Sequence, residues 1–302
     1  MDRREALAFL GASAMAGLVP GAGAAVPESA ATRPIPSSGE RLPAVGMGTW
    51  ITFDVAGNAS AGSMRAAILA DFFAAGGRLI DSSPMYGSSE QVLGDQMPGN
   101  AAGRLFAASK VWTMGALAGK RQAEASRALW KVKRFDLLEV HNFLDWETHL
   151  PMLQAMKSEG RVRYVGVTTS HGRRHDLAEQ IMRTRRIDFV QFTYNVAQRE
   201  VERDLLPIAA ERGIAVIINR PFDGGDLFGA KTAKALPGWA RELDCTTWAE
   251  AFLKFVVSHP AVTCAIPATS KPEHMVQNMR VLAGPLPDPK LRERIAADYE
   301  RA

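Results

Sequence analysis

The sequence predicts an α/β protein, a closed (β/α)8 TIM barrel that begins with an N-terminal β-hairpin. Eight short apolar runs alternate with segments of helical periodicity, and no linker rich in Pro, Gly or Ser interrupts the series. Apolar strands joined by helices are typical of a parallel sheet covered on its outside. The count of eight favours a closed barrel, although a doubly wound open sheet is the alternative. Against that alternative, no G-x-G-x-x-G follows the first strand.

Residues 1–30 differ from the rest of the chain and are predicted to be an export signal, either cleaved or disordered. Arg3 and Arg4 precede a weakly apolar run over residues 6–19, and Pro20 and a small-residue stretch over 22–24 follow. This order is that of a charged region, a hydrophobic region and a cleavage site. The paired arginines resemble a twin-arginine signal, which implies a periplasmic or otherwise exported protein. A cytoplasmic protein, or an uncleaved membrane anchor, remains open.

The barrel itself is predicted to occupy residues 34–302 as a single domain. Two extended pieces around Ser38-Gly39-Glu40 indicate the opening hairpin, with Ile35 before the turn and Leu42-Pro43 after it. Between the first and second runs, one helical face carries Ala66, Ala67, Ala70, Phe73 and Ala74, and other helices follow the later runs. The eight predicted strands are Val45–Trp50, Leu79–Ser82, Leu105–Ser109, Leu137–His141, Tyr164–Thr168, Phe189–Tyr194, Ala215–Ile218 and Val262–Ile266.

Charge and cysteine content exclude several classes of partner. The net charge of +4 comes from interspersed basic and acidic residues, so we expect no nucleic acid to bind. The densest basic spot, with Arg183, Arg185 and Arg186 near Arg173-Arg174, is interpreted as a solvated helix face. We expect no stable membrane insertion after processing, no metal site, and two buried unpaired thiols at Cys245 and Cys264.

Polar residues gather where three consecutive predicted strands end, which is where active sites of such barrels lie. Asp81 ends one strand and leads to Tyr86, Lys110 ends the next, and His141 ends the third. Tyrosine is a weak acid at neutral pH unless a cation favours its phenolate. Lys110 would supply that cation, and Asp81 would hold Lys110 in place. Tyr86 and His141 would then stabilise the negative charge that hydride transfer leaves on a carbonyl oxygen.

Each of these residues taken alone has an ordinary structural interpretation. An aspartate at a strand end is commonly a turn former, a tyrosine packs its ring, and a lysine after a strand is solvated. A histidine at the end of an apolar strand is commonly just hydrogen-bonded. The functional interpretation therefore depends on all four occurring together.

The motifs that carry these residues resemble those of the aldo-keto reductase family. The matching segments are residues 81–87, 105–110, 135–142, 164–167, 190–191 and 266–274. Together they span nearly the whole chain after residue 30. The resemblance implies reduction of an aldehyde or ketone, a small-molecule carbonyl substrate, by NADPH. It also implies that Tyr86 is the general acid, that Lys110 and Asp81 tune its acidity, and that His141 positions the carbonyl.

The same resemblance implies a cofactor site. Gln191 would hold the nicotinamide carboxamide, Asn278 would lie near the adenine, and Thr269 would lie near the adenosine phosphate. Where the family carries Ser-Asn at the carboxamide, this chain has Thr168-Thr169, and the amide of the second residue is lost. Where an aromatic ring commonly stacks on the nicotinamide, this chain has Asn219 followed by Arg220-Pro221-Phe222, so Phe222 is the candidate substitute.

The clamp for the 2′-phosphate of NADP also departs from the family pattern. Ala268 and His274 stand where basic residues are common, which leaves Lys271 as the candidate cation. The sequence therefore predicts NADP as the cofactor, with NAD possible. Three hypotheses stay open: an exported reductase that retains its cofactor, a cytoplasmic reductase whose N-terminus only mimics a signal, and a non-catalytic barrel that senses or binds a nucleotide.

Large apolar rings follow several strand ends and indicate an apolar or aromatic carbonyl substrate. Trp50 and Trp112 follow their strands directly, and Phe143 follows His141 closely. We predict that these three residues contact the substrate. Loop packing is the alternative for the remaining rings, which are Phe53, Trp146, Phe222 and Phe228.

Overall fold

The computed structural model describes residues 31–101, 103–229 and 232–301, so the predicted export signal lies outside the described residues. Eight parallel strands follow one another around a sheet in chain order. Bridges between Val45 and Ala265 and between Gly48 and Ala268 join the first strand of this sheet to the last and close the barrel. The predicted fold class is thus confirmed. The strands are β3 Met47–Gly48, β4 Leu79–Asp81, β5 Phe106–Val111, β6 Phe135–His141, β7 Val162–Thr168, β8 Phe189–Thr193, β9 Ala215–Asn219 and β10 Cys264–Ala265.

Side chains alternate between the barrel interior and the helix-facing surface, as the pleat of a strand requires. In β4, Leu79 belongs to the interior cluster, Ile80 belongs to the outer core, and Asp81 is again buried inside. Both faces of each strand are therefore dry, which explains why the strands are continuous apolar runs in the sequence. The interior cluster is Ile35, Leu42, Leu79, Phe106, Ala108, Leu137, Tyr164, Phe189, Ala215, Ile217, Cys264 and Ile266.

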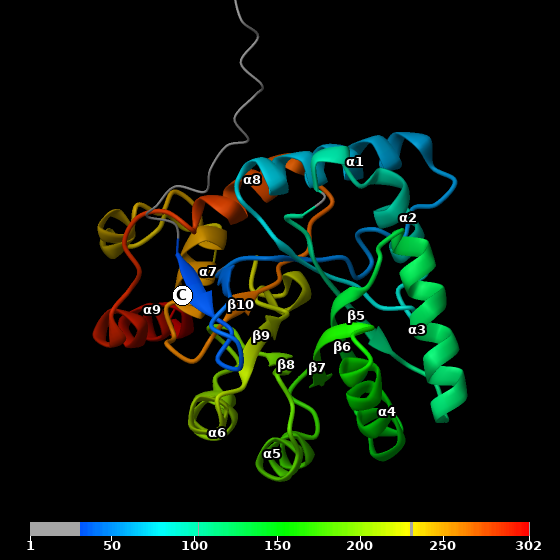
Figure 1. Ribbon diagram of the computed structural model, residues 1–302. Coiled ribbons are helices and arrows are strands. Elements are labelled where there is room, and N and C mark those ends of the chain that lie inside the picture. The colour runs from blue at the N-terminus through cyan, green and yellow to red at the C-terminus, as the bar shows by residue number, and fades with distance from the viewer. Residues whose placement is uncertain (1–30, 102, 230–231, 302) are drawn as a thin grey trace, which may run out of the picture.

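The helices surround the strands and cover their outer faces (Figure 1). Local sequence fixes where several helices begin, and helix α7 begins with a capping box. The Thr247 hydroxyl accepts from the Glu250 N–H, and the Glu250 carboxylate accepts from the Thr247 N–H. Within the described residues no helix has both the length and the apolar content needed to cross a membrane. The helices are α1 Ala59–Ala74, α2 Ser89–Gln96, α3 Ala116–Trp130, α4 Trp146–Ser158, α5 His175–Thr184, α6 Leu205–Arg212, α7 Trp248–Val257, α8 Pro272–Arg280 and α9 Pro289–Arg301.

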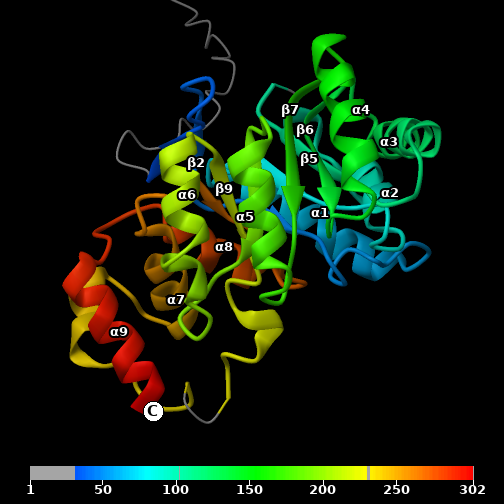
Figure 2. The same ribbon diagram turned by 90° about the horizontal axis from the view of Figure 1, so that it is seen from below.

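The N-terminal hairpin closes the end of the barrel where the strands begin (Figure 2). Strand β1, Thr32–Pro34, pairs antiparallel with β2, Arg41–Pro43. The hairpin was predicted, but its first strand ends at Pro34, one residue earlier than Ile35. Ile35 instead begins the turn and inserts its side chain into the interior cluster. This plug leaves the opposite end of the barrel, where the strands end, as the open mouth.

Both cysteines are free and buried, as the sequence predicted. The sulfur of Cys264 lies in the barrel interior, whereas Cys245 packs in the outer core. The basic residues Arg183, Arg185 and Arg186 are exposed on and just after α5, which agrees with a solvated face. Arg173 and Arg174 are also exposed, but they belong to the mouth of the barrel described below.

Candidate active site

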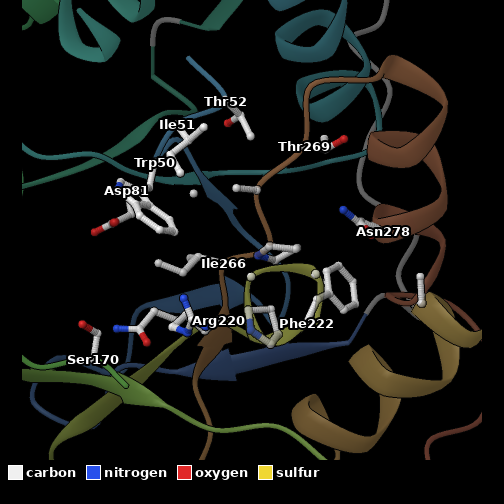
Figure 3. Close-up of a pocket in the computed structure, with 18 of the residues that line it drawn as sticks. Trp50, Ile51, Thr52, Asp81, Ser170, Arg220, Phe222, Ile266, Thr269 and Asn278 are labelled. Carbon is white, nitrogen blue, oxygen red and sulfur yellow. The ribbon is translucent and has the colours of Figure 1, made fainter. Parts of the chain in front are cut away.

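A cavity of about 1300 Å³ opens at the mouth of the barrel. Its walls are the ends of the strands and the loops that follow them, and Figure 3 shows Asp81 and Trp50 on one side with Thr269 and Asn278 on the other. Its volume exceeds the roughly 300–1,000 Å³ of ordinary small-molecule pockets, so two ligands of unequal size can share it.

The base of this cavity holds an ion pair between Lys110 and Asp81. The Lys110 ammonium donates to both carboxylate oxygens, at 2.7 and 2.6 Å, and to the backbone oxygen of Ser82 at 2.8 Å. Both side chains are almost completely buried. Burial alone lowers the pKa of Lys110, but Asp81, Tyr86 and Glu139 raise it, and the net shift is upward. Lys110 is therefore a permanent cation.

Tyr86 comes from the loop between β4 and α2, and the ammonium of Lys110 lies 5.2 Å from the centre of its ring. Burial raises the pKa of Tyr86, and Lys110 opposes that rise without reversing it. The phenol therefore keeps its proton at neutral pH. A protonated phenol above a fixed cation is suited to proton donation once negative charge develops beside it.

His141 ends β6, and its ring meets the ring of Tyr86 edge-on, with centroids 5.7 Å apart. Burial and the charge of Lys110 lower the pKa of His141 to about 2, so the imidazole is neutral. Its Nδ1 lies 2.9 Å from the hydroxyl of Ser83, which itself accepts from the Met85 N–H. We assign the Ser83 hydroxyl as the donor and Nδ1 as the acceptor of this hydrogen bond. The other ring nitrogen, Nε2, then carries the proton and can donate. The structure thus brings all four predicted residues to one rim.

Glu139 is a buried carboxyl that sequence reasoning left unassigned. It points into the barrel from β6 and accepts from Gln191 at 3.1 Å, while its other oxygen has no partner among the described residues. Burial raises its pKa well above the usual value, with Lys110 opposing the rise. Burial and the single hydrogen bond from Gln191 therefore favour the protonated form of Glu139. The signal for it was present, because a charged residue in the middle of an apolar strand requires a buried partner or a proton.

Gln191 is the centre of a hydrogen-bond network that supports the ion pair. Its amide nitrogen donates to Asp81 and to Glu139, both at 3.1 Å. Its oxygen accepts from Thr168 and from Asn219, both at 3.2 Å. The residue that resemblance assigned to the carboxamide is therefore fully hydrogen-bonded within the protein.

The side chains of Thr169 and Asn219 are also engaged in hydrogen bonds within the protein. The Thr169 hydroxyl donates to the backbone oxygen of Arg173 at 2.7 Å. The Asn219 amide donates to the Thr169 backbone oxygen, and its own oxygen accepts from Thr193. These residues line the cavity, but they tie β7, β8 and β9 together at the strand ends.

Most of the remaining residues predicted for the cofactor line the cavity. Thr269, His274 and Asn278 line the cavity from β10 and α8, and Pro221 and Phe222 line it after β9. Lys271 does not line it, because this residue is the exposed N-cap of α8. A contact between Lys271 and the 2′-phosphate therefore stays a prediction. Arg220, to which no role was assigned, does line the cavity and forms an ion pair with Asp223 at 2.8 Å.

Of the three predicted substrate rings, one lines the cavity. Trp50 does so and is 44% exposed. Phe143 adopts a left-handed backbone conformation that turns its ring into the core, where it is covered by the guanidinium of Arg174. Trp112 is exposed outside the cavity, because Gln122 of α3 hydrogen-bonds both its backbone N–H and its carbonyl. The expected positions of Phe143 and Trp112 are thereby corrected.

Comparison with protein families identifies one match over most of the chain: the model described as the aldo/keto reductase family covers residues 44–294. The methylglyoxal reductase YeaE of Escherichia coli is 27% identical over 248 residues, 80% of this chain and 86% of that protein. An NADH-specific methylglyoxal reductase of the same organism is also 27% identical, over 48% of this chain and 47% of that protein.

Solved structures show the same architecture. An aldo/keto reductase of Klebsiella pneumoniae in complex with NADPH superposes with a TM-score of 0.71 at 25% identity, covering 86% of this chain and 92% of that one. The holo form of an aldo-keto reductase of Bacillus halodurans gives a TM-score of 0.74 at 17% identity, over 89% and 96% of the two chains.

Proposed function

Because this chain belongs to the aldo/keto reductase family, we propose that it reduces an aldehyde or ketone with hydride from a nicotinamide cofactor. The observation that carries the proposal is the meeting of Tyr86 and His141 at one rim, above the buried Lys110–Asp81 pair. Negative charge that develops on a substrate oxygen is stabilised where a phenol, a neutral imidazole and a fixed cation meet.

The cavity fits a dinucleotide in its size and its charge. Asp81 is the single acidic residue among the described residues that line it, and Lys110 neutralises that charge. Arg173, Arg174 and Arg220 line it as well, so its potential favours an anionic ligand. Thr269, His274 and Asn278 would hold the adenosine part, and Pro221 and Phe222 would contact another part of the cofactor, NADP or NAD.

The bound cofactor supplies the hydride, and the residues of the chain manage the oxygen of the substrate. Nε2–H of His141 donates a hydrogen bond to the carbonyl oxygen and orients it. Tyr86 then transfers its proton to that oxygen as negative charge develops. Lys110 stabilises the phenolate that remains, and Asp81 with Gln191 holds Lys110 in position.

The relatives suggest a class of substrate. Two are named methylglyoxal reductases, so a small 2-oxoaldehyde is the first compound to test, and one of them is NADH-specific. Solved relatives hold NADP or NADPH. The assay should therefore include both NADPH and NADH.

The decisive experiment follows the absorbance of reduced nicotinamide while the purified protein is given NADPH or NADH and a panel of carbonyl compounds. The proposal expects carbonyl-dependent oxidation of at least one cofactor. Binding of a cofactor in a fluorescence titration, with no turnover across the panel, would instead favour the nucleotide-binding barrel.

We also propose that the protein is exported through the twin-arginine route, with its cofactor bound. Support comes from the order of Arg3-Arg4, the apolar run over residues 6–19 and the small residues after it. Cell fractionation with N-terminal sequencing tests this. Mature protein that begins after residue 20 outside the cytoplasm agrees with export, and an intact Met1 in the soluble cytoplasm contradicts it.

A further inference from the structure

Arg173 and Arg174, here called the arginine pair, stand on the loop between β7 and α5 and line the active-site cavity. The guanidinium of Arg173 makes no hydrogen bond or ion pair with any described residue. The guanidinium of Arg174 donates to the backbone oxygen of Asn142 at 3.1 Å and lies 5.4 Å over the Phe143 ring. Neither guanidinium is paired with a carboxylate in the part of the chain that the structure describes.

The position of the arginine pair relates it to the substrate. Asn142 follows His141 directly, so Arg174 sits beside the residue that would orient the carbonyl. In the ring of eight strands, β6 and β7 lie across the barrel from β10. Thr269 and Asn278, on the β10 side, line the opposite part of the cavity from Ser170, which precedes the arginine pair in the same loop (Figure 3). The adenosine part of a cofactor is thus remote from these arginines.

The electrostatic potential is positive in the part of the cavity that Arg173, Arg174 and Arg220 line. Burial lowers the pKa of His171, and Arg220 and Arg173 lower it further, so both guanidinium groups act on this neighbouring ring. Arg220 is already paired with Asp223. Among the described residues, no carboxylate pairs with Arg173 or Arg174, which share the cavity with Tyr86 and His141. Guanidinium groups bind carboxylates through paired hydrogen bonds, which makes a carboxylate the matching ligand.

We infer that the arginine pair is a carboxylate subsite, and that the preferred substrates are carbonyl compounds that also carry a carboxylate, that is, oxo acids and aldehyde acids. The inference rests on the proposed function, because it names the substrate class of the same site. It also departs from the expectation of a purely apolar substrate. In this arrangement His141 and Tyr86 hold the carbonyl oxygen while the arginine pair holds the far end of the molecule.

The test compares two four-carbon aldehydes, succinic semialdehyde and butanal, which differ in the terminal carboxylate. The ratio of their kcat/KM values is measured for the wild type, Arg173→Gln, Arg174→Gln and the double variant. Arg212→Gln is the matched control, because Arg212 is exposed at the end of α6, away from the cavity. We expect a ratio above one in the wild type and in the control, and a fall of ~10-fold or more in the double variant, as loss of a charge-assisted hydrogen bond implies. A wild-type ratio at or below one, or an unchanged ratio in the double variant, overturns the inference.

A binding measurement separates this inference from the proposed function. Calorimetry with succinate, which cannot be reduced, reports on the subsite alone. Weakened succinate binding in the double variant, with binding retained in Arg212→Gln, supports the subsite even if no aldehyde is turned over. Absence of succinate binding to the wild type overturns it even if butanal is reduced. Arg173→Gln is the cleaner single variant, since its side chain holds no other part of the described structure in place.

Discussion

Lys110 and Asp81 are bound to each other at the base of the cavity, with the ammonium donating to both carboxylate oxygens. Lys110→Met would leave Asp81 as a buried anion without its cation. We expect this change to lower the free energy of unfolding by about 3–5 kcal/mol. Urea unfolding measures it.

The double variant Asp81→Asn with Lys110→Met is the control for that interpretation. It removes both charges and leaves a neutral amide in hydrogen-bonding reach of Gln191. Its stability should lie above that of Lys110→Met alone. Equal or lower stability of the double variant would contradict a penalty caused by the unpaired charge.

The buried carboxyl of Glu139 predicts how the free energy of unfolding depends on pH. Burial holds its pKa well above 4.5, so above pH 4.5 the folded state keeps a proton that the unfolded state has lost. The contribution of Glu139 to stability is therefore present below pH 4.5 and is lost as pH rises through the folded pKa. Glu139→Gln lacks this dependence. The variant should gain on the wild type by up to about 1.4 kcal/mol for each pH unit above 4.5.

Urea unfolding of both proteins between about pH 5 and about pH 8, where protein stability is commonly greatest, measures this difference. Glu147→Gln is the matched control, because Glu147 is exposed in the first turn of α4. Its difference from the wild type should stay flat. A flat difference for Glu139→Gln as well would mean that Glu139 is ionised in the folded protein.

The barrel could be predicted from the sequence because its strands are buried on both faces and read as continuous apolar runs. The position of the Asp81, Tyr86, Lys110 and His141 side chains followed from the same reasoning. Residues at the ends of neighbouring parallel strands must meet at one edge.

Side-chain directions in the loops could not be predicted in this way. Phe143 lies two residues after His141 at the mouth, yet a positive φ of 55° turns its side chain into the core. Trp112 is drawn outward because its backbone is hydrogen-bonded to a side chain of α3. Arg173 and Arg174 are interpreted from the sequence as part of a solvated helix face, whereas they lie on the loop between β7 and α5 at the mouth of the barrel.

Gly166 is required by close packing of β7 against β8. A Cβ at this position would lie 2.6 Å from the backbone oxygen of Phe189 and 3.1 Å from the free oxygen of Glu139. Gly166→Ala should therefore cost about 1–3 kcal/mol of stability. Gly99→Ala is the control, since its Cβ would meet open space. Equal urea midpoints for Gly166→Ala and the wild type would show that β8 can move aside.

The two thiols should be unreactive in the folded protein. Burial raises the pKa of Cys245 to about 11, and burial also raises the pKa of Cys264. A thiol reagent at pH near 8, close to the ordinary thiol pKa of about 8.5, should label neither residue until denaturant is added. Rapid labelling of one thiol under native conditions would contradict the burial described here.

The central claim is that Tyr86 donates the proton to the substrate oxygen, and Tyr86→Phe tests it most directly. The change removes one hydroxyl and little volume, so affinity for NADPH, measured by fluorescence titration, should stay close to that of the wild type. Tyr164→Phe, which removes a hydroxyl at the plugged end of the barrel, is the control. The account predicts that carbonyl-dependent oxidation of NADPH falls by about 100-fold or more in Tyr86→Phe. Full turnover in that variant, with the cofactor still bound, would contradict it.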